Sequence, residues 1–154
     1  MLIAALILAL TAPPEPCAGK GTALYVDATQ RMLWLCESGK AKESIPVALG
    51  RGGLDKRMEG DARVPLGEYT LGSPVPSKAY HLFIPVGYPT ASQRRQGFTG
   101  GAIGVHGPKR AYGGPSSTSI DWTLGCIAVG TDDDIGRVAD WVKATKARRI
   151  VITK

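Results

Sequence analysis

The alternation of apolar and polar positions predicts a protein built mostly of β-strands. Between residues 23 and 48, three runs in which apolar residues recur every second position are separated by the turn-forming sequences DATQ and ESGK. In the second run, Leu33 and Leu35 fall on one face and Trp34 and Cys36 on the other. The expected strands cover residues 23–27, 31–37 and 41–48, and they predict a β-meander.

Beyond the meander, the pattern predicts shorter strands joined by long loops. Residues 50–76 are rich in glycine, proline and charge, and read as a long connection around a short strand at 67–72. Two more β segments are expected at 79–88 and 101–107, a loop at 108–121, and a final strand at 148–154. Loops as long as these in a compact domain are often functional.

One helix is predicted, directly after a short apolar segment at 126–129. The Thr131 hydroxyl can cap its start, and three aspartates follow in the first turn, where carboxylates suit the positive end of the helix dipole. The apolar stripe of this helix is formed by Ile135, Val138, Ala139 and Val142. The fold class expected from these elements is therefore mostly β with one main helix.

The length and the first residues suggest one domain behind a targeting segment. A chain of 154 residues fits a single domain. Residues 2–10 form an unbroken apolar run, which is shorter than the roughly 20 residues that a spanning helix needs but suits a secretory signal. We expect a signal or targeting segment at 1–20, an exported protein of the periplasm or cell envelope, and a catalytic domain at 21–154. An uncleaved membrane-associated stub or a misassigned start is the alternative.

Charge and cysteine content exclude several classes of partner. The net charge of +6 comes from 19 basic and 13 acidic side chains, but the basic clusters are not interleaved with aromatic residues. We therefore expect no nucleic-acid partner, and a solvated surface of an envelope protein instead. The three cysteines form no CxxC motif and only two histidines accompany them, so we expect no zinc site. We expect a monomer.

The odd number of cysteines leaves at least one without an intrachain partner. If Cys17 survives cleavage, a bridge between Cys17 and Cys36 is the more plausible pair, and Cys126 stays free. The sequence around it, TLGC followed by an apolar run, allows three interpretations: a buried core residue, half of a disulfide, or a nucleophile.

A histidine precedes this cysteine at a spacing that suggests chemistry. His106 ends an apolar segment in GVHG, and Cys126 follows 20 residues later. A free thiol is only a few per cent ionised at neutral pH, so a cysteine enzyme needs an imidazole to take its proton and later return it. Gly107 and Gly125 would let the backbone approach a substrate, and amides near Gly125 and Cys126 are candidates to face an oxyanion.

This arrangement resembles the signature of the L,D-transpeptidase catalytic domain, the YkuD-type family: a histidine, a spacer, then Ser or Thr, any residue, Gly and Cys. Here the spacer runs from 107 to 122 and the second part is TLGC. The resemblance extends over residues 23–152, through GDARVPLGEYTL, YHLFIPVGYP and DWTLGCIAVGTDDDI. It implies a β-sandwich or barrel whose main helix follows the nucleophile loop, the segment DWTLGC at residues 121–126 that ends at the cysteine.

The resemblance also assigns roles. Cys126 is the nucleophile, His106 its base and later acid, and Gly107 orients the imidazole through its backbone carbonyl; Thr123 shapes the loop. The family attacks the amide between the L-centre of meso-diaminopimelate and the terminal D-alanine of a peptidoglycan stem peptide. A thioester forms, and the acyl group passes to an amine of a neighbouring stem or of a protein. No metal or organic cofactor is implied.

Two positions depart from the family pattern. Many members have a histidine before the glycine and an arginine two residues after the cysteine, where this chain has Leu124 and Ala128. A guanidinium binds a carboxylate through two parallel hydrogen bonds, so its loss puts recognition of the substrate's carboxylate in question. Arg110 or Lys109 is a candidate replacement, and an exposed loop charge is the alternative for both.

Four other residues have two interpretations each. Trp122 and Tyr112 could line a substrate groove or simply cover the core. His81 could assist the site, although a strand histidine is more often structural, and Asp121 could orient a ring nitrogen, a role that the resemblance gives to a carbonyl. Three hypotheses follow: an exported cysteine acyltransferase, an L,D-carboxypeptidase or other hydrolase with the same site, and a non-catalytic wall-binding module.

Overall fold

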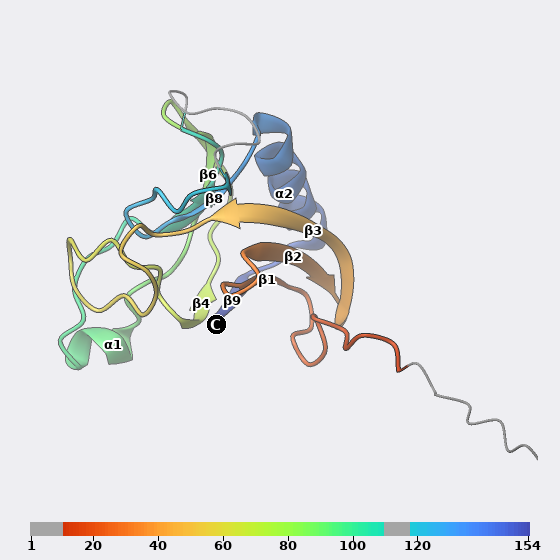
Figure 1. The fold of residues 1–154 in the computed structure, drawn as a ribbon, viewed down its shortest axis with the longest axis horizontal. Coiled ribbons are helices and arrows are strands. Elements are labelled where there is room, and N and C mark those ends of the chain that lie inside the picture. Colours follow the sequence, from red (N-terminus) through yellow and green to blue (C-terminus); the bar gives the residue numbers. More distant parts are fainter. Residues whose placement is uncertain (1–10, 110–117) are drawn as a thin grey trace, which may run out of the picture.

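The computed structural model of the protein describes residues 11–109 and 118–154. Residues 1–10 and 110–117 lie outside the described part, so the first half of the expected targeting segment and the candidates Arg110 and Tyr112 are not placed. Figure 1 shows the described chain as a curled sheet with a long helix lying against it.

The described elements are nine strands and two helices. The strands are β1 (Ala23–Asp27), β2 (Met32–Glu37), β3 (Lys40–Ala48), β4 (Gly67–Thr70), β5 (Val75–Ser77), β6 (His81–Pro85), β7 (Gly104–His106), β8 (Ile127–Val129) and β9 (Arg149–Thr153). The helices are α1 (Ala91–Arg95) and α2 (Asp132–Thr145). The expected fold class, mostly β with one main helix after the nucleophile loop, is confirmed.

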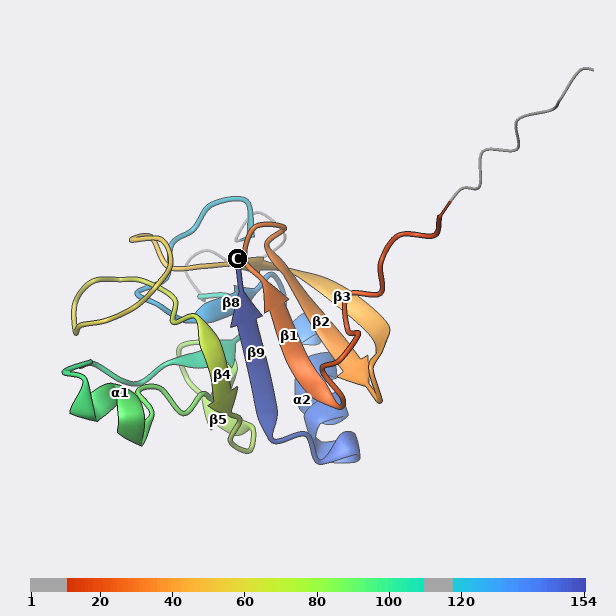
Figure 2. The same ribbon diagram turned by 90° about the horizontal axis from the view of Figure 1, so that it is seen from below.

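The nine strands form one sheet in the order β4-β9-β1-β2-β3-β8-β7-β6-β5. The predicted meander is present, since β1, β2 and β3 pair antiparallel in succession. The last strand, β9, enters between β1 and β4, parallel to β1, and Figure 2 shows these strands side by side. Strands β7 and β8 run parallel, and β8 joins the end of β3.

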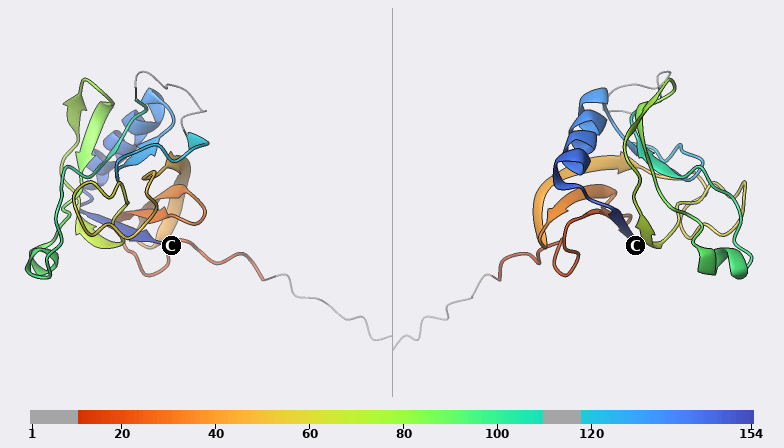
Figure 3. Two further views of the ribbon diagram at one scale, coloured as in Figure 1. Left: turned by 60° about the vertical axis from the view of Figure 1, so that its left-hand side comes forward. Right: turned by 180° about the vertical axis from the view of Figure 1, so that it is seen from behind.

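The sheet curls so far that its two ends approach each other. Leu71, after β4, forms an antiparallel bridge with Val86, after β6, and the Gly72 amide donates to the Pro85 carbonyl at 2.7 Å. Helix α2 contacts both β2 and β6, which are four places apart in the sheet, so the sheet must bend around it (Figure 3). The main core lies between the helix and the sheet.

The core explains why α2 forms where the sequence predicts it. The Thr131 hydroxyl accepts a hydrogen bond from the Asp134 amide, and the helix begins at the next residue after this cap. The buried side chains of the helix are those of the expected stripe, Ile135, Val138, Ala139 and Val142. They pack against the inward faces of the strands, which include Leu33 and Leu35.

The opposite face of the meander carries a disulfide. Cys17 and Cys36 are bonded, both are fully buried, and they pack with Tyr25 and Trp34 in a second small cluster. The expected pairing is confirmed and leaves Cys126 as the free cysteine.

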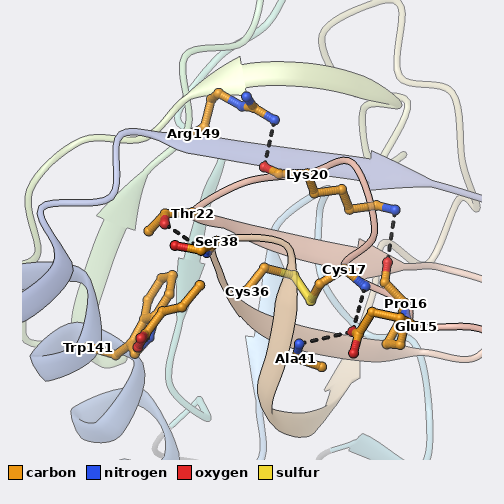
Figure 4. The surroundings of a disulfide bond; sticks show 11 residues. Glu15, Pro16, Cys17, Lys20, Thr22, Cys36, Ser38, Ala41, Trp141 and Arg149 are labelled. Atoms are coloured by element: carbon orange, nitrogen blue, oxygen red, sulfur yellow. Dashed lines mark hydrogen bonds between the residues drawn. A yellow bond between two sulfur atoms is a disulfide. The ribbon is translucent and has the colours of Figure 1, made fainter.

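The residues before β1 are bound to the domain rather than separate from it. The Glu15 carboxylate accepts hydrogen bonds from the amides of Cys17 and Ala41, and Arg149 donates to the Lys20 carbonyl, as Figure 4 shows. Packing of the chain thus begins at about residue 15, ahead of the expected boundary at residue 21. A cleavage that preserves this packing has to fall before it.

Two elements were not expected from the sequence. Strand β5 has no buried residue and sits at the edge of the sheet, so no apolar alternation marks it. Helix α1 also buries no side chain, but a capping box of Thr90 and Gln93 begins it. That spacing, Thr-x-x-Gln, is the signal in the sequence that identifies this helix.

No helix within the described ranges is long and apolar enough to cross a membrane.

Candidate active site

Strand pairing brings His106 and Cys126 to the same face of the sheet. In the parallel pair of β7 and β8, His106 is the partner of Ala128. Cys126 directly precedes β8, two residues before Ala128, so continued alternation from the strand places its side chain on the same side as His106, and both residues line one cavity. Residues separated by 20 positions in sequence thus become neighbours, one at the end of β7 and the other directly before β8.

The imidazole of His106 is held by a backbone carbonyl and by aromatic rings. Its Nδ1 lies 2.7 Å from the Gly107 carbonyl oxygen, the group that the resemblance assigns to this role. The Tyr80 ring stacks on it with centroids 3.8 Å apart and planes inclined by 20°, and Phe83, its partner across β6 and β7, lies at 6.1 Å. The side chain is buried, with 1% of its surface exposed.

This environment fixes the protonation of the imidazole. A carbonyl only accepts hydrogen bonds, so Nδ1 carries the proton and Nε2 is left with a lone pair. Burial lowers the pKa of His106 to about 4, and the hydrogen bond to Gly107 opposes this shift only in part. At neutral pH the ring is therefore an uncharged base whose free nitrogen is Nε2.

Cys126 is a half-buried neutral thiol in this structure. Its Sγ donates to the Ala102 carbonyl at 3.5 Å. Burial raises the pKa of the thiol above its ordinary value, while a hydrogen bond from the Gly104 backbone and the charge of Lys56 oppose the shift. The resting pair thus combines an uncharged thiol with an uncharged imidazole.

The loop before the cysteine is held by Thr123, which is 2% exposed. The Thr123 hydroxyl donates to the Cys126 carbonyl at 2.7 Å and accepts from the Gly125 amide at 3.2 Å. The backbone of Thr123 is in turn bound on both sides, since its amide donates to the Leu49 carbonyl and its carbonyl accepts from the Arg51 amide. Thr123 therefore fixes the loop to the end of β3. The Gly125 amide, expected to face an oxyanion, is already engaged by this hydroxyl.

Both glycines of the motif are required by space. Gly125 has a φ of +129°, which favours glycine, and a Cβ there would lie 2.7 Å from the Arg63 carbonyl oxygen. A Cβ on Gly107 would collide with the Tyr80 carbonyl and approach Ile135 to 3.0 Å. Because Gly107 has no side chain, the backbone of Tyr80 can lie against it, and this places the Tyr80 ring on the imidazole of His106.

The pair opens into a cavity of ≈ 710 Å³, which is lined by Arg51, Tyr80, Phe83, Gly101, Ala102, Ile103, His106, Lys109, Trp122, Thr123, Leu124 and Cys126. Trp122 is a wall of this cavity, with its ring 5.9 Å from that of His106. A second cavity of ≈ 290 Å³ shares Arg51, Gly101 and Leu124 with the first, so the two meet beside the nucleophile loop.

Of the other candidate residues, His81 and Asp121 do not contact the imidazole. His81 is exposed and lines a different hollow beside α2. The Asp121 carboxylate accepts from the Leu49 amide at 2.9 Å and pairs with Arg31, so it braces the loop rather than the imidazole. Leu124 is 66% exposed at the cavity rim, whereas Ala128 is fully buried opposite His106.

Three lining residues were not assigned from the sequence. Tyr80 and Phe83 stack on the imidazole, and Arg51 contributes a cation from a loop far away in sequence. A Cβ on Gly104 would collide with the Phe83 ring, but this contact joins two strands and leaves no signal in the sequence. Arg51 stands between Gly50 and Gly52, but nothing local indicates which loop it faces.

Within the described part of the chain, no group of three or more His, Cys, Asp or Glu side chains is arranged to hold a metal ion.

Solved structures of other proteins share this fold. Similar solved structures are the helical cell shape determining protein Pgp2 of Campylobacter jejuni, Bd1075 of Bdellovibrio bacteriovorus, and an L,D-transpeptidase of Xylanimonas cellulosilytica. Their TM-scores are 0.70, 0.61 and 0.53, at 23%, 23% and 18% identity. The matches cover 86%, 85% and 92% of this chain.

The same matches cover 47%, 47% and 65% of those proteins, so the chain spans about half the length of the first two. No curated protein sequence matches the chain. The family pattern of the L,D-transpeptidase catalytic domain, YkuD, matches residues 21–152, which include the His106 and Cys126 strands and the loop between them. The chain therefore belongs to the L,D-transpeptidase catalytic domain family, which acts on peptidoglycan peptides.

Proposed function

We propose that the protein is an exported cysteine acyltransferase that uses Cys126 to cleave and re-form amide bonds of peptidoglycan stem peptides. The observation that carries the proposal is the site itself: a free thiol and an imidazole with a free Nε2 share one face of the sheet and one cavity. No metal or cofactor enters the proposed reaction.

The reaction begins with proton transfer. Nε2 of His106 takes the thiol proton, and Sγ attacks the carbonyl of the L-centre of meso-diaminopimelate. The imidazolium then returns its proton to the leaving nitrogen, so D-alanine departs as the amine and a thioester remains on Cys126. The Tyr80 ring, stacked at 3.8 Å, offers its π face to the transient imidazolium.

Backbone groups stabilise the tetrahedral intermediate in this proposal. The Gly125 amide is engaged by Thr123, so we assign the oxyanion to the amide of Cys126, which the same hydroxyl positions through the Cys126 carbonyl. Gly107 keeps the imidazole in the tautomer that leaves Nε2 free.

The acceptor decides the product. An amine of a neighbouring stem or of a protein attacks the thioester carbonyl and gives a proton to Nε2 of His106. The C–S bond then breaks, the Cys126 thiolate takes the proton back from the imidazolium, and a new amide is released. Water in the same position would give an L,D-carboxypeptidase. One of the similar structures is a helical cell shape determining protein, and on that likeness we extend the proposal to a role in cell shape through the peptidoglycan.

Export is supported by covalent structure. Disulfides persist in oxidising compartments, and the Cys17–Cys36 bond is buried in the domain. The apolar run at 2–10 is the segment we propose as the export signal, with its cleavage ahead of residue 15.

The test is incubation of the purified protein with disaccharide-tetrapeptide, followed by mass spectrometry. We expect release of D-alanine and dimers linked between two diaminopimelates, both abolished in Cys126→Ala. Tripeptide without dimers assigns hydrolysis instead. D-alanine release by Cys126→Ala at the wild-type rate contradicts the nucleophile, and a carbapenem that adds no mass to the wild type supports the wall-binding alternative.

A further inference from the structure

Arg51 places a cation in the cavity that contains Cys126. Its side chain is exposed and lines both this cavity and the smaller one that joins it. Among the residues that the structure describes, its guanidinium has no hydrogen-bond or ion-pair partner. A guanidinium that faces an active site without a protein anion is available to a substrate.

The backbone that carries Arg51 is fixed to the nucleophile loop. The Arg51 amide donates to the Thr123 carbonyl at 2.9 Å, and Gly50 bridges to Thr123 in parallel register. On the other side, the Gly52 amide donates to the Ala62 carbonyl at 2.9 Å. Cβ atoms at Gly50 or Gly52 would collide with the backbone of the 61–62 segment, so the glycines allow this close packing. The backbone of Arg51 is thus fixed beside the loop that ends at Cys126, and its side chain lines the same cavity.

Other cations near the cavity are less suited to this task. Lys56 is 4% exposed and its ammonium is bound by the Asp61 carboxylate at 2.8 Å. Lys109 lines the cavity but has interactions of its own within the protein. A lysine also presents a point charge, whereas an arginine binds a carboxylate through two parallel hydrogen bonds.

The family arginine two residues after the cysteine is absent, and the structure shows that its position has no room for one. Ala128 is fully buried and lies opposite His106 in the sheet. A carboxylate in the cavity must therefore be bound by a residue from another element.

We propose that Arg51 binds a carboxylate of one of the two residues joined by the scissile amide, and thereby selects stems in which that group is free. The inference rests on the proposed function, because the amide and its neighbouring carboxylates are those of that reaction. Two carboxylates have the required chemistry: that of the terminal D-alanine, and that of the D-centre of diaminopimelate.

The test compares three substrates: the tetrapeptide stem, the same stem with a C-terminal D-alaninamide, and the stem with diaminopimelate amidated at its D-centre. Release of the terminal residue is measured as kcat/KM for wild type, Arg51→Gln and Arg51→Lys. The control is Arg94→Gln, since Arg94 is an exposed arginine on α1 that lines neither cavity. Thermal unfolding verifies that the variants are folded.

With the natural stem, we expect Arg51→Gln to lower kcat/KM by about 10- to 100-fold, the range for one charged hydrogen-bonded contact. The kcat/KM of Arg51→Lys should lie between those of wild type and Arg51→Gln, and that of Arg94→Gln should equal that of wild type. With the stem in which the recognised carboxylate is amidated, the kcat/KM values of wild type and Arg51→Gln should agree within about twofold. The amidated stem that gives this result identifies the carboxylate that Arg51 binds.

A loss in Arg51→Gln that is equal for all three substrates, or no loss for any, overturns the assignment of Arg51 while the acyltransferase proposal stands. Absence of any release by wild type refutes the proposed function, and the inference falls with it. A loss in Arg94→Gln equal to that in Arg51→Gln attributes the effect to overall charge and also overturns the assignment.

Discussion

The resting state of the Cys126 and His106 pair gives a sharp prediction. Burial lowers the pKa of His106 to about 4 and raises the pKa of Cys126 above its ordinary value of 9.0. A preformed thiolate–imidazolium pair requires the opposite order. Since burial raises the thiol pKa and lowers that of the imidazole, we expect Cys126 to rest as the protonated thiol at pH 7, with activation only when substrate is bound.

Alkylation of Cys126 measures this directly. It is the free cysteine of the described chain, so iodoacetamide labelling followed by mass spectrometry reports on one thiol. We expect the rate to rise about tenfold per pH unit from pH 6 to pH 8 without a plateau, since alkylation follows the thiolate fraction. His106→Asn should change the alkylation rate at pH 7 by less than about twofold.

The same variant should be severely impaired in acyl transfer. Loss of a general base costs about 10²- to 10⁴-fold, so His106→Asn separates the chemical role of the imidazole from the resting ionisation of the thiol. A plateau in alkylation below pH 7, or a tenfold slower alkylation of His106→Asn at that pH, would show a preformed ion pair and refute the reasoning.

Three further predictions concern stability, measured by urea unfolding. The pKa of His106 is 6.5 in the unfolded chain and about 4 in the folded protein, so the free energy of unfolding should be at its full value above pH 6.5 and fall by about 3 kcal/mol as the pH falls to 4. An equal fall in His106→Gln would show that His106 is not its cause. Gly125→Ala should destabilise by about 1–3 kcal/mol because of its φ of +129°, whereas Gly136→Ala, with open space in a helix, should stabilise by up to about 1 kcal/mol; an equal effect of both contradicts the conformational argument. Replacing Cys17 and Cys36 by serine should cost about 3 kcal/mol for a loop of this length, and unchanged stability would show that the bridge does not constrain the unfolded chain.

Local signals in the sequence predicted most elements. The alternation at 23–27 gives β1 with the same bounds, and the Thr131 cap followed by an apolar stripe gives α2. The elements that were missed, β5 and α1, bury nothing, so no apolar period could mark them. Of the candidate site, the spacing of His106 and Cys126 pointed to the pair that the structure places in one cavity, and the TLGC motif pointed to Thr123 and Gly125.

Tertiary structure decided how these parts meet. The insertion of β9 between β1 and β4, the bridge from Leu71 to Val86, and the parallel pairing of β7 with β8 join segments that are distant in sequence. Such contacts leave no local period, because each strand shows only which of its faces is buried and not which strand lies beside it.

The sequence by itself therefore determined the kinds of elements, favoured the pairing of Cys17 with Cys36, and singled out Cys126 and His106 as the candidate nucleophile and base. Only the tertiary structure decided the properties on which catalysis depends: the burial that keeps His106 uncharged, the carbonyl that leaves Nε2 free, and the loop that brings Arg51 to the cavity of Cys126. The physical reason is that the pKa of a side chain, its tautomer and its neighbours depend on groups from several strands at once. Periodicity, helix caps and motifs, in contrast, depend only on residues within a single segment.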